Sequence, residues 1–488
     1  ITLYGTAPGE LMEDVYFRRD FIELHASPDP VDWLALPEFR HGTAVRAIPR
    51  SDFQDMETPW GYGGPVALHE SAFWRGLGLW RQRQTDNNRI AEFVRLHPFL
   101  NPMRFRGWFD HLRFDRLTVL VDLRQPESAR WRSYSKGTRY SIRQAQRKLS
   151  FRRLVPGESA VFRRCYETGL EYNRAESQYY FRPDYYDAIL AAPWATTWVA
   201  EHGGEPIAVA CFLKGGSLAH YHLSGGDGRA RETFAHYGLL DLAIEHFAAQ
   251  GFRWMHLGGG RSNRPDDALL AFKAKFSPRR IPFYTGGLVF LRDAYDKLAH
   301  GSNELFLSYQ FPPAPEIGAK PISLRRTGRN DFPHFFRLKC DIDNIVWSGH
   351  DRPPEWDRLA AWFDAQHVAG SRRRIYLAEF EDQVLGYTYV DDLGDALEIT
   401  IGIASRESGR GLGRTFLRQL MHEIEREGER RPVECWIFPE NVASIKVFEA
   451  AGFRRDPARV PRTFTMPFVE GPAPQYCWVY DRNAASQT

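Results

Sequence analysis

Residues 406–416 read RESGRGLGRTF and stand between two segments of different periodicity. The preceding LEITIGIA (397–404) is apolar and β-branched, as in a strand, and the following TFLRQLMHEIERE (415–427) has apolar residues at helical spacing. A strand that ends in a glycine-rich turn and opens a helix presents backbone N–H groups outward, and the helix dipole adds positive charge there. The turn therefore predicts an anion site, and Arg410 and Arg414 reinforce its sign.

The glycine spacing decides between two kinds of phosphate ligand. A dinucleotide fingerprint needs a G-x-G-x-x-G turn inside a βαβ unit and an acidic residue about 20 positions later. Here the glycines stand at 409, 411 and 413, and the segments before them read as a meander of strands. The nicotinamide interpretation fails, and the alternative to an anion site is a plain tight connection between strand and helix.

Length and composition set the broad class of the protein. At 488 residues the chain is expected to form about three domains, and 43% hydrophobic with 26% charged residues is typical of a packed soluble protein. The net charge of +3 gives no indication of a nucleic-acid binder. The five cysteines show neither disulfide nor metal-ligand spacing, which predicts a reducing, cytoplasmic location and no metal.

We find no apolar run long enough for a membrane span and no signal-peptide pattern at the N-terminus, so no membrane insertion is expected. The oligomeric state stays open.

The order of predicted elements divides the chain. The proline-rich FPPAPEIGAKPISL (311–324) predicts a linker. After it we expect a helix, a three-strand meander, the glycine turn with its helix, a strand and a last helix. Before it, 151–295 repeats a similar order, with a strand that ends in LGGG (257–260) before its last helix. Residues 1–130 carry strand-like and helical runs in a less regular order.

The pieces after the linker resemble the GNAT acyltransferase superfamily: SGRGLGRTFL (408–417), VECWIF (433–438) and ENVASIKVFEAAGF (440–453), in that order. The resemblance covers 323–488 and implies acetyl-CoA or another acyl-CoA as cosubstrate, with the pyrophosphate held by the turn. The cofactor-binding residues that it implies are Arg410, Gly411, Gly413 and Arg414 at the phosphates, Asn441 at the pantetheine, and Ile401 and Ile403 on the splayed strand that binds the thioester carbonyl.

Two positions depart from the family pattern. Ser408 stands where the turn usually has Gln or Arg, and Phe448 stands where a Tyr usually protonates the leaving thiolate. A phenyl ring has no proton to give. The thiolate then leaves unaided or takes a proton from another group, or the domain binds CoA without catalysis. Glu398, on one face of the splayed strand, is the candidate general base, and its alternative is a solvent-facing strand residue.

The front of the chain resembles the Fem-type branch of the same superfold and its BioF2-like relatives. The motifs are TPWGYGGP (58–65), YSKGTRYSIRQAQRK (134–148), HYHLSG (220–225), HLGGG (256–260) and LLAFKAKF (269–276). This resemblance covers roughly 10–300 and implies two GNAT-like lobes with the acceptor in a cleft between them. Its donor is aminoacyl-tRNA or an acyl-CoA.

The two resemblances together give the predicted fold. It is α/β (α+β), with three GNAT-like lobes, each a mixed, mostly antiparallel sheet flanked by helices. The boundaries are a degenerate first lobe at 1–145, a Fem-type or BioF2-like lobe at 146–305, a linker at 306–322 and a C-terminal GNAT domain at 323–488.

Basic and imidazole side chains are the candidate substrate contacts of the front lobes. Arg139, Arg143 and Arg147 recur every fourth residue and share a helical face suited to phosphates, with Lys136 at its start. The alternatives are a solvated face or a contact with a neighbouring acidic lobe.

Alternation on a strand points His220 and His222 to the same side. We expect them to line the cleft, or to be packed in the core, because no cluster of three or four metal ligands is visible. Lys273 is the lysine that matches the family motif.

The predicted function is transfer of an acetyl or aminoacyl group to an amine acceptor, a small molecule or a sugar or peptide precursor, by direct attack on a CoA thioester or related donor. The alternative is an aminoacyl-tRNA-dependent aminoacyltransferase with an accessory C-terminal domain. The small net charge opposes tRNA, and the arginine face favours it. In a third interpretation the C-terminal domain is only a CoA-binding module.

Overall fold

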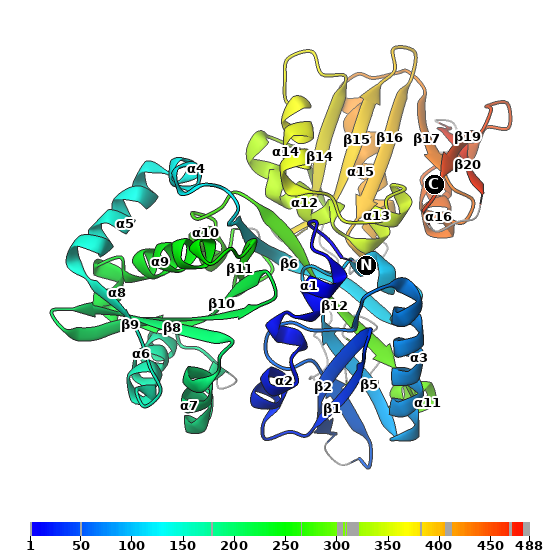
Figure 1. The fold of residues 1–488 in the computed structure, drawn as a ribbon. Helices are drawn as coiled ribbons and strands as arrows, with labels where there is room; N and C mark the ends of the chain where they lie inside the picture. The colour runs from blue at the N-terminus through cyan, green and yellow to red at the C-terminus, as the bar shows by residue number, and fades with distance from the viewer. Residues whose placement is uncertain are drawn as a thin grey trace. The chain divides into compact units, whose positions relative to one another are not determined.

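The computed structural model describes residues 2–48, 51–176, 179–264, 266–299, 306–307, 309, 322–380, 383–405, 412–467 and 471–481. The chain forms two compact units (Figure 1). Unit 1 is Ile1–His111 with Asp115–Ala299, and unit 2 is Leu112–Phe114 with His300–Thr488. Most of the predicted linker lies outside the described residues. In the described part of the chain, no helix has the length and apolar character needed to cross a bilayer.

Unit 1 contains, within its described residues, one sheet of 12 strands in the order β1–β2–β3–β5–β12–β6–β11–β10–β9–β8–β7, with β4 paired to β2. The two lobes expected at 1–145 and 146–305 therefore share a single sheet, joined where β6 lies between β12 and β11. The strands are β1 Val31–Leu36, β2 Phe39–Ala47, β3 Gln54–Glu57, β4 Val66–Ala67, β5 Arg89–Arg95, β6 His111–Asp122, β7 Ser150–Arg153, β8 Ala195–His202, β9 Glu205–Gly215, β10 Leu218–Gly226, β11 Trp254–Gly259 and β12 Arg280–Val289.

Helices cover both faces of the second half of this sheet. In Figure 1, α5 and α9 lie on one face of β8–β10 and α6 and α7 lie on the other. Residues 207–213 of β9 are accordingly all buried, as expected of a strand with both faces covered. The helices of unit 1 are α1 Pro8–Met12, α2 Arg19–Ala26, α3 Glu70–Asp86, α4 Glu127–Ser133, α5 Lys136–Lys148, α6 Ser159–Tyr172, α7 Pro183–Ala191, α8 Gly228–Glu232, α9 Ala235–Ala249, α10 Ala268–Lys273 and α11 Arg292–Leu298.

Helix α6 lies directly on the backbone of β10. A Cβ added to Gly169 would lie 2.8 Å from the Cα of Gly225, and a Cβ added to Gly225 would lie 2.6 Å from the Cα of Tyr166. Both distances are shorter than real Cβ contacts. Glycine at these positions therefore sets how closely the helix and the strand pack.

Strands β10 and β11 pair only where they begin. Their parallel register joins Leu218 to Trp254, Ala219 to Met255 and His220 to His256. Beyond this last pair the described residues of the two strands are not partners of each other, and each strand has an irregularity in its register with its other neighbour. The strands thus diverge from His220 and His256 onward, and we call this gap in strand pairing the unit 1 divergence.

Unit 2 contains a sheet of 8 strands within its described residues, in the order β13–β14–β15–β16–β17–β20–β18, with β19 paired to β20. The meander predicted at 374–404 is confirmed as β14, β15 and β16. The strands are β13 Ser323–Arg326, β14 Arg373–Phe380, β15 Gln383–Asp392, β16 Leu397–Ile403, β17 Val433–Ile437, β18 Phe453–Arg455, β19 Arg462–Thr465 and β20 Pro472–Tyr480, and the helices are α12 Phe332–Lys339, α13 Ile342–Trp347, α14 Trp356–Ala365, α15 Leu412–Arg426 and α16 Val442–Ala450.

Strands β16 and β17 repeat the arrangement of β10 and β11. They are parallel, and their register joins Leu397 to Val433 and Glu398 to Glu434. The described remainder of β16 and of β17 continues without further pairing between the two. We call this gap the unit 2 divergence. The predicted α/β class, with mixed and mostly antiparallel sheets flanked by helices, is confirmed in both units.

Candidate functional site

The glycine turn that opened the sequence analysis is described only at its end. Residues 406–411, with the predicted Arg410 and Gly411, lie outside the described residues. Gly413 and Arg414 are in the first turn of α15. A Cβ on Gly413 would lie 3.2 Å from side-chain atoms of Ile403 and Val447. The start of α15 therefore packs against the end of β16 and against α16, and Arg414 is exposed there.

The residues predicted to bind the thioester and the pantetheine lie at the unit 2 divergence. Ile401 and Ile403 are half-buried on β16 and pack against the hydrophobic core of unit 2. Asn441 caps α16, where its Oδ1 accepts a hydrogen bond from the backbone N–H of Ser444 at 3.1 Å. One polar atom of Asn441 is therefore used by the helix itself.

Glu398 is the last residue of β16 that is paired with β17. Its Oε2 accepts a hydrogen bond from Arg462 Nη2 at 2.7 Å, and Arg459 Nη2 donates to Glu434 Oε2, also at 2.7 Å. On the other side Glu398 is opposite Asp391, which Arg373 holds in an ion pair. Carboxylates on three neighbouring strands are thus each held by an arginine, and one oxygen of Glu398 is occupied.

Phe448 is a core residue. Its side chain is buried with Leu417 and Met421 of α15, and its ring meets Phe453 edge-on with centroids 5.0 Å apart. The ring carries no proton donor. This position therefore offers no general acid.

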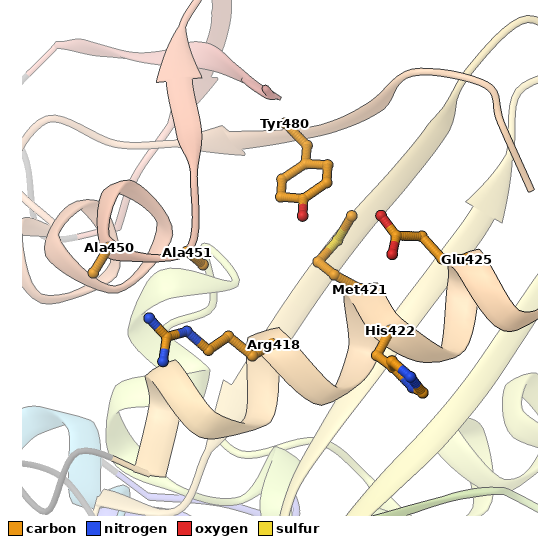
Figure 2. A pocket seen from close by; sticks show the side chains of 7 residues that line it. All are labelled: Arg418, Met421, His422, Glu425, Ala450, Ala451 and Tyr480. Carbon is orange, nitrogen blue, oxygen red and sulfur yellow. The ribbon is translucent and has the colours of Figure 1, made fainter. Parts of the chain in front are cut away.

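A pocket of ≈ 240 Å³ lies elsewhere on unit 2, against the later turns of α15. Figure 2 shows Arg418, Met421, His422 and Glu425 of α15 beside the pocket, with the hydroxyl of Tyr480 directed toward Met421. Ala450 and Ala451, at the end of α16, complete the lining. The pocket is separate from the first turn of α15, where the phosphates are predicted.

In unit 1 the strands diverge next to a buried histidine–aspartate group. His220 Nε2 lies 2.8 Å from Asp14 Oδ2, and His97 Nε2 lies 3.6 Å from the other oxygen of the same carboxylate. Burial raises the pKa of Asp14, but the two imidazoles lower it more, so it is held well below its usual value. Among the described residues, Nδ1 of His220 has no hydrogen-bond partner.

His222 belongs to a second group on the same side of β10. Its Nε2 lies 3.2 Å from His25 Nε2 and 2.9 Å from the hydroxyl of Tyr185. Tyr221, between the two histidines, stacks on Phe212 instead. The alternation predicted from the sequence therefore places His220 and His222 on one side of the strand, but with different partners.

Lys273 lies beside the unit 1 divergence. Its Nζ donates to the carbonyl of Gly259 on β11 at 2.7 Å and lies 5.6 Å from the ring centroid of Tyr221 on β10. Burial lowers its pKa to about 7, since Asp267 compensates only in part. His256 is buried and its Nε2 contacts the hydroxyl of Thr118 at 2.9 Å.

The predicted phosphate-binding face of α5 is partly occupied by the protein itself. Arg139 donates to the carbonyls of Trp131, Arg132 and Tyr134, with the shortest bond, 2.7 Å, to Tyr134. It therefore caps the end of α4. The guanidinium of Arg143 lies 5.4 Å from the ring centroid of Trp131, and Lys136 is exposed.

Several polar residues of unit 1 are absent from the sequence predictions: Asp14, His25, His97 and Tyr185. They come from the N-terminal 100 residues and from α7, and lie up to 206 positions from their partners. No local pattern marks them.

Comparisons with known proteins agree with the repeated arrangement of elements. Residues 132–273 of unit 1 and residues 322–454 of unit 2 each match a family model described as an acetyltransferase (GNAT) domain. A curated relative, the L-methionine sulfoximine/L-methionine sulfone acetyltransferase of Salmonella typhimurium, is 28% identical over 114 residues. This match covers 22% of this chain and 64% of the relative, so the chain spans less than two thirds of its length.

Two solved structures are also similar to the chain. The crystal structure of FemX has 9% sequence identity and a TM-score of 0.48, over 61% of this chain and 99% of that one. A structure of AAC(6')-Ib in complex with ribostamycin and coenzyme A has 21% identity and a TM-score of 0.29, over 35% of this chain and 98% of that one. On the two family matches, each compact unit contains one segment that belongs to the acetyltransferase (GNAT) domain family.

Proposed function

We propose that the donor of this acyltransferase is a CoA thioester and that it binds at the unit 2 divergence. The observation that carries the proposal is the short pairing of β16 with β17, which ends at Glu398 and Glu434. Strand edges beyond that point offer backbone N–H and C=O groups to the amides of a pantetheine chain. The first turn of α15, with exposed Arg414, lies at the far end of β16 and suits the pyrophosphate.

The proposed reaction is direct attack of an amine on the thioester carbonyl. The ammonium of the acceptor first loses a proton to Glu398, through the oxygen that Arg462 does not hold. The neutral amine then forms the new C–N bond, and backbone N–H groups of β16 stabilise the oxyanion. Collapse breaks the C–S bond. The thiolate leaves as an anion, since Phe448 has no proton to donate, and the second amine proton passes to water.

We also propose that the unit 1 divergence binds substrate, with Lys273 as its charged contact. A lysine with a pKa of about 7 exists as both amine and ammonium at neutral pH, and it bridges the two diverging strands. His220 and His222 would line the same region. The acceptor is an amine-bearing small molecule or a sugar or peptide precursor.

Aminoacyl-tRNA remains the alternative donor for unit 1, and the geometry of α5 weakens it. The guanidinium of Arg139 already serves three backbone carbonyls, so the face predicted to bind phosphates is left with Lys136, Arg143 and Arg147. Phosphate contacts supply most of the affinity for a nucleic acid and make it strongly salt-dependent.

The test is calorimetric titration of acetyl-CoA into the full-length protein and into two charge-reversal variants of α15. Arg414→Glu should weaken binding about 10- to 100-fold, the equivalent of losing one charge-assisted contact of about 1.5–3 kcal/mol. Arg418→Glu is the matched control, with the same change one turn further along the helix, and should retain affinity within about threefold.

Wild-type protein that does not bind acetyl-CoA, or variants that bind equally well, would refute the CoA site at α15. Binding of aminoacyl-tRNA that falls steeply with salt would then favour the alternative donor. An amine panel with mass detection of acylated products identifies the acceptor class once a donor is known.

A further inference from the structure

Three ligand-type atoms converge in unit 1 around His222, beyond the last residue of β10 that pairs with β11. His25 Nε2 and His222 Nε2 are 3.2 Å apart, and each is 2.9 Å from the hydroxyl oxygen of Tyr185. They come from α2, β10 and α7, which are distant in the sequence. Tyr185 is buried, and both imidazoles are half-buried. We call these residues the His–His–Tyr group.

The hydrogen bonding of His25 directs a lone pair into the group. Its Nδ1 lies 3.0 Å from the backbone carbonyl oxygen of Phe21, which can only accept, so Nδ1 carries the proton. In the neutral imidazole, Nε2 is then unprotonated and faces the other two atoms.

The spacing of the three atoms suits a shared cation. Zinc–nitrogen and zinc–oxygen bonds are about 2.0–2.2 Å long. With bonds of about 2.05 Å, separations of 2.9 and 3.2 Å subtend roughly 90° and 103° at the ion, between octahedral and tetrahedral angles. We propose that His25 Nε2, His222 Nε2 and the Tyr185 oxygen bind one first-row transition-metal cation of the zinc type.

The ligand set and its surroundings support this assignment. Imidazole nitrogens suit Zn²⁺, Cu²⁺, Fe²⁺ and Ni²⁺. A metal-binding histidine usually donates its other N–H to a carbonyl or carboxylate, as His25 does to Phe21. Three protein ligands leave at least one coordination position for water or substrate, as in catalytic zinc sites. His222 lies on the part of β10 that has separated from β11, so this position would adjoin the unit 1 divergence.

The neighbouring group of Asp14, His97 and His220 is the obvious competitor, because its ligand atoms lie within 4.8 Å of one another. Its hydrogen bonds point to a different use. Nδ1 of His97 accepts from the backbone N–H of Phe99, so the proton of that ring is on Nε2, the atom that would have to bind the metal. All three side chains are fully buried. We therefore assign this group to hydrogen bonding and the metal to the His–His–Tyr group.

Metal binding at this group should release a proton, which can be measured in addition to the number of ions bound. The two imidazoles bind as neutral ligands, and the phenol of Tyr185 binds as phenolate. Each cation bound therefore releases one proton to the buffer. A hydrogen-bonded network without a metal has no such release.

The experiment uses the full-length protein, freed of metal with a chelator and titrated with Zn²⁺ against a chromophoric competitor. Wild type should bind one Zn²⁺ per His–His–Tyr group, and calorimetry in two buffers of different protonation enthalpy should show about one proton released per ion. His222→Ala should weaken binding at least 100-fold. Tyr185→Phe should weaken it about 10-fold or more and abolish the proton release.

Two matched controls should behave as wild type: Tyr186→Phe, the adjacent buried tyrosine, which donates to Glu167, and His97→Gln in the competing group. Circular dichroism checks that each variant is folded. If His222→Ala does not fold, the number of protons that Tyr185→Phe releases on binding Zn²⁺ decides whether the proposal holds. Absence of saturable binding in wild type, loss of binding in His97→Gln instead of His222→Ala, or unchanged proton release in Tyr185→Phe would overturn the proposal.

Discussion

The unit 1 and unit 2 divergences have the same strand topology, but the side chains at their last paired residues differ in kind. In each unit the third strand of a meander pairs in parallel with the strand after the next helix, for only two or three residues. The last pair is His220–His256 in unit 1 and Glu398–Glu434 in unit 2. The histidines are buried, with Asp14 and Lys273 nearby, whereas the glutamates are held by Arg462, the first residue of β19, and by Arg459 just before that strand.

This difference shows that the order of strands and helices produces the gap in strand pairing, whereas residues distant in the sequence determine which charged and polar groups surround it. Strand pairing in both units follows from the local order of strands and helices. The partners of the last paired residues come from elsewhere in the chain: Asp14 lies 206 positions before His220, and Arg462 lies 64 positions after Glu398. Four substitutions probe this contrast, and they are described from the largest expected effect to the smallest.

Asp14→Ala should have the largest effect, on stability. Removing its carboxylate leaves two buried donors without an acceptor, the backbone N–H of Tyr16 and Nε2 of His220, at a cost of about 1–3 kcal/mol each. The pKa of Asp14 is depressed in the folded state, so its stabilisation is present above the unfolded pKa of 3.8 and is lost as the pH falls below it.

Urea denaturation from pH 3 to pH 8 measures this effect, with Asp184→Ala, an exposed ion-paired aspartate, as the control expected to lose less than about 1 kcal/mol. A loss of equal size in both variants would show that the buried Asp14 carboxylate stabilises the protein no more than an exposed ion pair does.

Glu398→Gln should reduce kcat for acetyl transfer about 100-fold, because a positioned general base contributes about 10²–10⁴-fold. Affinity for acetyl-CoA should be unchanged. Asp391→Asn is the matched control: it lies opposite Glu398, is also held by an arginine, and should keep kcat within about threefold. Steady-state kinetics across pH separates the two. Equal and small effects of both variants on kcat would show that Glu398 has only a structural role, as the ion-pair partner of Arg462.

Lys273→Met should lower activity and raise stability together. Folding buries this ammonium at a cost, since burial lowers its pKa to about 7 from an unfolded value of 10.5. The variant should be more stable at pH 7 on the order of 2 kcal/mol, after allowance for the lost bond to Gly259.

The pKa shift also predicts how the stability gain of Lys273→Met depends on pH. The gain is largest below pH 7, where folding of the wild type buries a charged lysine. It shrinks as the pH rises toward 10.5, where Lys273 is neutral in the unfolded wild type as well. Thermal melts at pH 6, 8 and 10 measure it. A destabilised but fully active variant would mark Lys273 as a structural residue.

Phe448→Tyr should have the smallest effect. The added hydroxyl enters a core beside Phe453 and costs about 1–2 kcal/mol unless it finds a partner. We expect kcat to change less than about threefold, because the ring packs into the core and supplies no acid at the divergence. Denaturation and single-turnover kinetics check both parts. A rise in kcat of tenfold or more would show that the position still faces the thiolate.

The fold was largely predictable because its signals are local. The meander at 373–403, the amphipathic α15 and the repeated order in 151–295 all follow from hydrophobic periodicity and turns. The joining of the two front lobes into one sheet was not predicted. It depends on β6 pairing with β11 and β12, contacts that span more than 130 residues and leave no local pattern.

The site was predictable only in part, for a similar reason. Alternation on β10 placed His220 and His222 on one side, and spacing placed Arg139 and Arg143 on one face of α5. Sequence spacing, however, says nothing about which partners a face meets. Arg139 caps the carbonyls at the end of α4, and His222 meets His25 across 197 positions. The role of Glu398 stays a prediction that its substitution will test.

The contact between α6 and β10 has a consequence for ligand binding. Gly169 and Gly225 bring the backbones of helix and strand together, so the separated end of β10 rests on main-chain atoms that have no rotamers to change. The conformational entropy of this end of β10 is therefore lost during folding and not on binding. A ligand that enters the unit 1 divergence meets a surface already in its final shape.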